Sequence, residues 1–85
     1  MANRVIAYTP VVVPDGGFIV AIAEKDIAVY VPVASEPKLG SYELATTRAT
    51  ALNEGIGVSI IDAWKIVTSS MSRSLKEGRW RERSA

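Results

Sequence analysis

Three runs of apolar and β-branched residues open the chain, and short turn sequences separate them. Residues 4–13, 17–23 and 27–33 are rich in Val and Ile and include aromatic residues, which is typical of strands. The sequence PDGG at 14–17 is a turn, because proline fixes φ and glycine accepts positive φ. The charged sequence EKD at 24–26 interrupts the apolar pattern again. Connections this short predict a three-stranded antiparallel meander.

Helical periodicity replaces strand periodicity after a short connection at residues 34–41. Residues 42–54 are predicted to form a first helix, with Ser41 as its N-cap and Glu43 favourably placed in its first turn. This segment is rich in alanine and threonine, so we expect it to pack closely. The connection is too short to mark a domain boundary, and residues 1–85 are predicted to form a single domain.

A second helix is predicted at residues 60–77, where Ser59 belongs to a capping pattern that precedes an apolar run. Apolar residues recur there at helical spacing and form one stripe: Ile60, Trp64, Val67, Met71 and Leu75. We expect Trp64 to lie in the core. The polar run TSSMSRS at 68–74 is predicted to be a solvated helix face. With the three strands, the order of elements is βββαα, which predicts an α+β fold.

Both faces of the predicted sheet are apolar, although an antiparallel sheet with one face in water should alternate apolar and polar residues. Two helices can cover one face, so we expect the other to pack on a second copy or on a partner. The residues predicted for this oligomer interface are Ile6, Tyr8, Val12, Ile19 and Tyr30. Two alternatives stay open: small alanines and tyrosine hydroxyls make the face tolerable in water, or the helices split across both faces. Pro10 and Pro32 lack an N–H group and mark a sheet edge, a bend or a strand end.

The composition argues against most enzymatic chemistry. The 85 residues include no cysteine and no histidine, which excludes disulfides, thiolate chemistry and imidazole catalysis. The carboxylates fall at predicted turns and helix ends, and PDGG lacks the phosphate-loop pattern. The sequence contains no apolar run of about 18 residues that could span a membrane. We therefore expect a non-enzymatic cytoplasmic protein without cofactor, metal site or membrane span.

The C-terminal part of the chain is basic, although the net charge of the whole chain is only +1. The candidate partner-binding residues are Arg73, Lys76, Arg79, Trp80, Arg81 and Arg83. Tryptophan and arginine are enriched at binding hot spots, so a protein contact is the first interpretation. Nucleic-acid binding, with Trp80 stacked on a base, is an alternative. A basic tail at 79–85 that is solvated or packed on its own subunit is another.

Residues 49–71 resemble the C-terminal helical part of small phage and bacterial-genome proteins of unknown function. The matching features are Ala51, Asn53, Gly57, Ser59, Ala63, Ile66 and the run Ser69-Ser70-Met71. The resemblance implies a phage-encoded protein of the host cytoplasm or the virion. We predict a self-associating interaction protein, either a virion component or an inhibitor of a host system. The alternatives are a nucleic-acid-binding accessory protein and an oligomer that sequesters a small anionic ligand such as a nucleotide.

Overall fold

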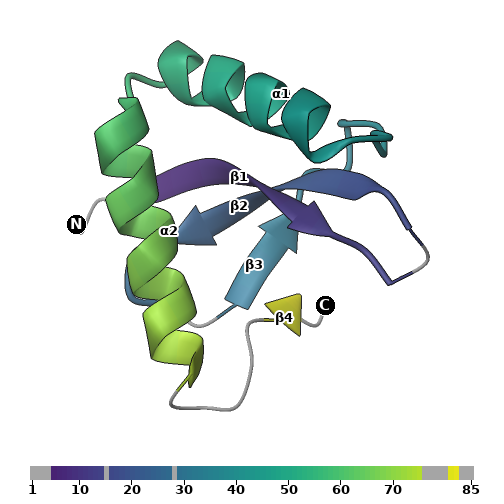
Figure 1. Cartoon of the computed structure of the whole chain (residues 1–85). Coiled ribbons are helices and arrows are strands. Elements are labelled where there is room, and N and C mark those ends of the chain that lie inside the picture. The colour runs from purple at the N-terminus through teal and green to yellow at the C-terminus, as the bar shows by residue number, and fades with distance from the viewer. Residues whose placement is uncertain (1–4, 15, 28, 76–80, 83–85) are drawn as a thin grey trace.

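A three-stranded antiparallel sheet followed by two helices forms the body of the protein in a computed structural model (Figure 1). The structure describes residues 5–14, 16–27, 29–75 and 81–82, with the backbone alone for 73–75 and 81–82. Its elements are β1 (Ile6–Val12), β2 (Phe18–Glu24), β3 (Val29–Pro32), α1 (Tyr42–Gly55), α2 (Ile60–Leu75) and β4 (Arg81–Glu82). The predicted α+β fold is confirmed, and both helices begin at the predicted residues.

The sheet gains a fourth strand that the sequence analysis did not predict. The strand order is β1-β2-β3-β4, and β4 pairs with β3 in parallel, with Val29 opposite Arg81 and Tyr30 opposite Glu82. A parallel neighbour needs a long connection, and here α1 and α2 lie between the two strands in the chain. The dipeptide Arg81-Glu82 carries no apolar alternation, so periodicity gives no sign of this strand.

The pairing register decides which residues share a face of the sheet. In the pairing of β1 with β2, Ala7 lies opposite Ala23 and Thr9 lies opposite Ala21. Residues directly opposite each other in antiparallel strands project from the same face. The helix α2 crosses the front of the strands (Figure 1), and Ala7, Ala21 and Ala23 are fully buried. We assign these alanines to the face under α2, where small side chains let the helix approach closely.

The same register separates the five residues predicted for an oligomer interface. Ile6, Tyr8 and Val12 project from one face, whereas Ile19 and Tyr30 project from the alanine face. The prediction that these residues form one bare face is therefore wrong. Its error lies in the pairing, because strand composition does not reveal which residues stand opposite each other. Only Val12 is strongly exposed, and the other four are half-buried within their own chain.

The outer edge of β1 is closed by a side chain of α1. The Tyr8 backbone N–H donates to Asn53 Oδ1 at 2.7 Å, and Asn53 Nδ2 donates to the Tyr8 carbonyl at 3.0 Å. Asn53 is buried, and α1 runs beside β1 (Figure 1). Pro10, two residues further along this edge strand, has no N–H to offer, as predicted from its position. The amide and the proline protect this edge against pairing with a further strand.

Two serines of α2 hold the turn between β2 and β3. The Ser70 side chain is fully buried and donates to the Ile27 carbonyl, while Ser69 Oγ accepts from the Asp26 N–H at 3.1 Å. Asp26 has a φ of 61°, a left-handed conformation that Asp tolerates better than most residues. The prediction that the polar run containing these serines is a solvated face is therefore wrong at Ser69 and Ser70. Their hydroxyls satisfy backbone groups of the neighbouring turn.

The predicted helix caps and the predicted turn at PDGG are confirmed. Ser41 Oγ accepts from the Leu44 N–H and Ser59 Oγ accepts from the Asp62 N–H, so each serine caps its helix. In the PDGG turn, Gly17 has a φ of 86°. An added Cβ at Gly17 would lie 2.8 Å from Lys38 Cε and 3.0 Å from the Leu39 carbonyl oxygen. The positive φ favours glycine there, and the Leu39 carbonyl oxygen leaves little room for a Cβ.

Candidate protein-binding groove

The helix α2 turns its largest apolar side chains away from the sheet. Ile60 is 72% exposed, Trp64 67% and Met71 46%, whereas Ile66 is 7% exposed. The prediction that Trp64 lies in the core is therefore wrong. At about 100° per residue, Ser70 lies about a quarter of a turn and Ile66 more than about a third of a turn from the centre of the stripe of Ile60, Trp64, Val67 and Met71.

The rotation of α2 about its axis has a physical cause. Small side chains on the alanine face let α2 approach the sheet closely, and Ile66 and Ser70 are the buried side chains of this helix. The Ser70 hydrogen bond to the Ile27 carbonyl then fixes which side of the helix faces inward. A bulky indole at this place would separate the helix from the sheet. The stripe is consequently left on the outer side of the helix.

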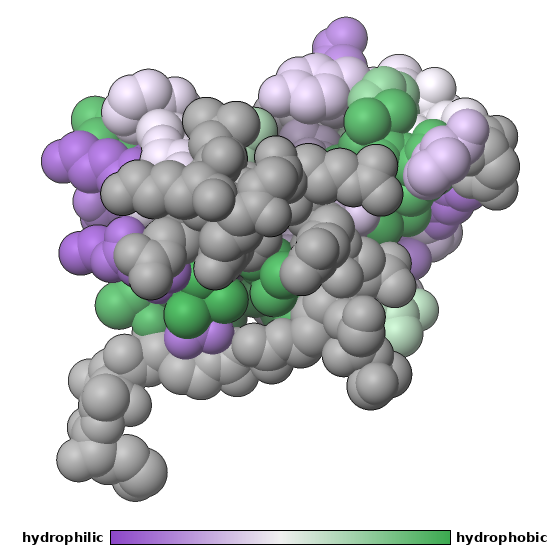
Figure 2. Space-filling view, turned by 90° about the horizontal axis from the view of Figure 1, so that it is seen from below, coloured by the Kyte–Doolittle hydropathy of each residue, from purple (hydrophilic) through white to green (hydrophobic). Residues whose placement is uncertain are grey.

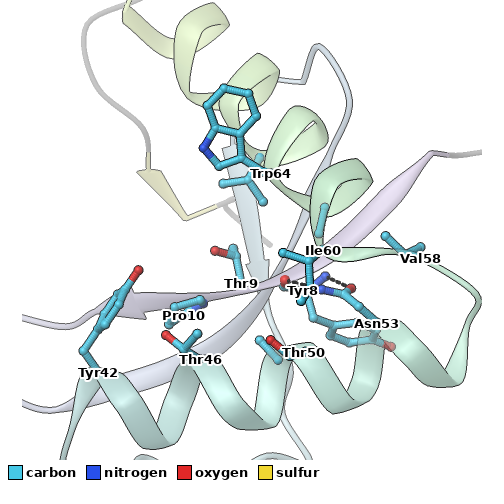
Figure 3. A pocket seen from close by; sticks show the side chains of 13 residues that line it. Tyr8, Thr9, Pro10, Tyr42, Thr46, Thr50, Asn53, Val58, Ile60 and Trp64 are labelled. Carbon is cyan, nitrogen blue, oxygen red and sulfur yellow. Dashed lines mark hydrogen bonds between the residues drawn. The ribbon is translucent and has the colours of Figure 1, made fainter.

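The exposed stripe forms one wall of a groove between the helices (Figure 3). Ile60, Trp64 and Val67 line it from α2. Thr46 and Thr50 line it from α1, as does Tyr42 at the start of that helix. The floor is β1, which contributes Thr9 and Pro10. The two helices diverge from their connection (Figure 1).

The groove continues past Val67 toward the far end of β1. Tyr42 and Val67 also line a second hollow, together with Met71, Val12 and Phe18. Since the two hollows share these residues, we treat them as one surface, the apolar groove, which runs from Ile60 to Met71. Its ends are eleven residue steps apart along α2, a span of roughly 16 Å at the helical rise of about 1.5 Å per residue. Phe18 and Tyr42 meet edge to face, with ring centroids 5.8 Å apart.

The groove is lined by apolar and neutral polar groups. Among the described residues, none with a carboxylate, ammonium or guanidinium group lines it. Its polar groups are hydroxyls and the Asn53 amide, and that amide is already bonded to Tyr8. The Thr46 hydroxyl oxygen is buried and has no hydrogen-bond partner among the described residues. In the same part of the chain, no three Asp or Glu residues come together in a way that could hold a metal ion.

Charge is concentrated on the other side of α1. Arg48 donates from Nε and Nη2 to the two carboxylate oxygens of Glu36, at 2.5 Å and 3.0 Å. The Arg48 hydrogen bond holds the pKa of the Glu36 carboxyl below its ordinary value, and the same contact raises the pKa of Arg48. This ion pair links the connection before α1 to the helix. It does not line the apolar groove.

The predicted basic site is largely outside the described structure. Lys76, Arg79, Trp80 and Arg83 lie outside the described residues, and for Arg73 and Arg81 only the backbone is described. The backbone of Arg81 pairs with β3, which places this part of the tail on its own subunit. In the view from below, the coloured residues around the grey ones are mixed, with hydrophobic and hydrophilic residues side by side (Figure 2). The role of the basic side chains stays a prediction.

The sequence analysis identified the stripe but assigned it to the wrong surroundings. One signal could have indicated its exposure: the central strand β2 carries Ala21 and Ala23 on one face, and a face this small cannot accommodate a tryptophan under a closely packed helix.

None of the helices in the described part of the chain has the length and apolar character needed to cross a membrane. No protein-family model, curated protein or solved structure gave a significant match to this chain.

Proposed function

We propose that this protein is a non-enzymatic interaction protein that binds another polypeptide in the apolar groove between α1 and α2. The observation that carries the proposal is the exposure of Trp64, at 67%, within a stripe of apolar side chains on α2. Isolated apolar residues on a surface are ordinary, but a contiguous apolar surface on a small protein marks an interaction site.

Energetics support this use of the groove. Trp64 exposes roughly 150 Å², and covering that area would contribute about 4 kcal/mol at about 25 cal/mol per Å². Tryptophan and tyrosine are the apolar residues most enriched at binding hot spots, and Trp64 and Tyr42 face the same groove. The lining has no charged group among the described residues, so an apolar helix or loop could bind without desolvating a charge.

The sequence resemblance supports a phage-encoded protein, either a virion component or an inhibitor of a host system. Both roles use binding surfaces and need no catalytic groups. The uncharged groove does not favour phosphate or nucleotide ligands, which call for Lys, Arg or aligned N–H groups. Binding of a nucleic acid or a small anion depends on the basic side chains near the C-terminus.

Site-specific photo-crosslinking in cells tests the proposal. Trp64 is replaced by p-benzoylphenylalanine, an aromatic residue that forms covalent adducts with neighbouring polypeptides on irradiation. The matched control carries the same residue at Lys65, which is exposed on another side of α2. We expect adducts from position 64 and none from position 65, with the contact peptides identified by mass spectrometry. Absence of any polypeptide adduct from position 64 would contradict a binding role for the groove.

A further inference from the structure

We infer that the segment bound in the apolar groove is an amphipathic α-helix of a partner protein, with lysine or arginine residues on the flank that lies next to α1. The inference rests on the proposed function and names the chemistry of the partner. It is carried by three observations: the closed edge of β1 at the floor of the groove, the spacing of the apolar stripe, and a row of unpaired carboxylates beside the groove.

The floor of the groove does not accept a partner strand. β1 is an edge strand, and an extended partner would have to pair with its outward N–H and carbonyl groups. The Asn53 amide already binds both of these groups of Tyr8, and Pro10 has no N–H to donate. An extended segment would therefore leave its own backbone groups unpaired against this surface. A helix satisfies its backbone groups internally, so it can bind here through its side chains alone.

The stripe on α2 has the spacing of a helix-binding surface. Its residues recur at intervals of four, three and four positions and span roughly 16 Å: Ile60, Trp64, Val67 and Met71. An amphipathic partner helix presents its apolar residues at the same alternating intervals, and about three turns of it match this length. Two helices that carry such rows pack side by side at a shallow crossing angle. The partner helix would lie along the groove, with its apolar side chains in the two hollows.

A row of acidic and hydroxyl residues runs along α1 beside the groove. Its members follow one another at intervals of four, three and four positions: Glu43, Thr47, Thr50 and Glu54. Residues three and four positions apart are neighbours on a helix surface. Thr50 lines the groove, so this row, the acidic border, runs along the groove on the side of α1. It has a carboxylate at each end.

The two carboxylates of the acidic border are available to a partner. Glu43 and Glu54 are exposed, and neither side chain makes a hydrogen bond or ion pair in the described part of the chain. The carboxylate of Glu36, by contrast, is already bound by Arg48. Charges of opposite sign across an interface attract, and like charges repel. The border therefore favours lysine or arginine on the adjacent flank of the partner helix and disfavours an acidic segment.

The stripe and the acidic border contribute differently to binding. Trp64 and its apolar neighbours supply most of the affinity, because covering them removes apolar surface from water. The carboxylates stay in contact with water at the border, where ion pairs add little affinity but select the partner and its orientation. Glu43 and Glu54 are eleven positions apart, or roughly 16 Å along α1. Basic residues at about the same separation on the partner helix would face both of them.

Selection from a random peptide library tests the inference, with the full chain as the target and peptides of about 16 residues, or about four helical turns. The Trp64→Glu variant serves as the counter-target, so peptides that bind elsewhere are removed. We expect the retained peptides to carry apolar residues at intervals of three and four and lysine or arginine on one flank. They should become helical on binding, as measured by difference circular dichroism. Peptides with strictly alternating apolar residues, or with more acidic than basic residues, would overturn the inference.

Two variants of equal charge change locate the contact. Glu54→Lys alters the acidic border, and Asp62→Lys alters an exposed position that does not line the groove. A lysine in the last turn of α1 suits the helix dipole, so Glu54→Lys should fold normally. We expect Glu54→Lys to raise the Kd of the selected peptides about three- to tenfold, and Asp62→Lys to change it less than about twofold. Equal affinity for Glu54→Lys and the wild type, or no peptide that depends on Trp64, would overturn the inference.

The photo-crosslinker at position 64 separates failure of this inference from failure of the proposed function. Adducts with a basic amphipathic segment of another protein would support both. Adducts with a segment that lacks this pattern would overturn the inference and leave the groove as a binding site. Absence of any polypeptide adduct would contradict the proposed function as well.

Discussion

The two sides of the helix pair are built from different kinds of residues. The side that faces the strands uses small or polar residues, such as Ala49, Asn53 and Ser70, and it is closed by hydrogen bonds to backbone groups. The side that faces the groove carries the large apolar side chains, Trp64 and Ile60. The difference teaches that the fold is held by close approach and polar pairing, while the largest apolar side chains of α2 stay exposed.

The sharpest test of this comparison exchanges one residue from each side of α2 for alanine. Ile66→Ala should lower the free energy of unfolding by about 2–4 kcal/mol, because it leaves a cavity under the helix. Trp64→Ala should change it by less than about 0.5 kcal/mol in dilute solution, since the indole is mostly exposed. Urea denaturation measures both values. An equal loss for the two variants would show that Trp64 packs within its own chain.

On α1, the same comparison sets Asn53 against Thr50. Asn53→Ala removes both hydrogen bonds to Tyr8, so the backbone N–H and carbonyl of Tyr8 lose these partners. The free energy of unfolding should fall by about 1–3 kcal/mol. Thr50→Ala, in the groove wall, should have little effect on folding. Urea denaturation gives the stabilities, and hydrogen exchange of the Tyr8 amide measures directly whether its hydrogen bond to Asn53 protects it. Unchanged protection of that amide in the Asn53 variant would contradict the hydrogen bonds between Asn53 and Tyr8.

A smaller effect is expected for the serines of α2. Ser70→Ala removes a buried hydroxyl that donates to the Ile27 carbonyl, so we expect a loss of about 1 kcal/mol. Ser72→Ala, at an exposed position of the same helix, should be neutral within about 0.5 kcal/mol. Thermal unfolding of the two variants, run in parallel, measures the difference. Equal melting temperatures would show that the Ser70 hydrogen bond to the Ile27 carbonyl does not stabilise the position of the helix.

The smallest effect concerns the Glu36–Arg48 ion pair, on the charged side of α1. Arg48 lowers the pKa of Glu36, so the carboxylate stabilises the folded chain above its unfolded pKa of about 4.3. That contribution is lost as the pH falls through the lowered folded pKa. We expect the wild type to lose slightly more stability on acidification than Glu36→Gln, because surface ion pairs contribute little. Identical stability profiles from pH 6 to about pH 3 would contradict the pair.

Local sequence signals predicted most of the fold. Ser41 and Ser59 mark the helix starts, PDGG marks the first turn, and the alternating apolar runs mark three strands. These features depend on residues close together in the chain, which a single sequence displays. The short strand β4 was missed because its pairing with β3 arises from tertiary placement of an Arg-Glu dipeptide.

The candidate site was only half predictable. Spacing revealed the stripe around Trp64, but spacing cannot show how a helix is rotated against a sheet. In the structure Ile66 and Ser70 are the buried side chains of α2, and the alanine face beneath the helix depends on the register of β1 with β2. The grouping of Ile19 with Tyr8 failed for the same reason. Long-range pairing determined both outcomes.

Photo-crosslinking from the groove tests the central claim most directly. p-Benzoylphenylalanine at position 64 should form adducts with another polypeptide, whereas the same residue at position 65 should form none, because Lys65 lies away from the groove. No adduct from position 64, or equal adducts from the two positions, would contradict the assignment of the stripe as a binding surface.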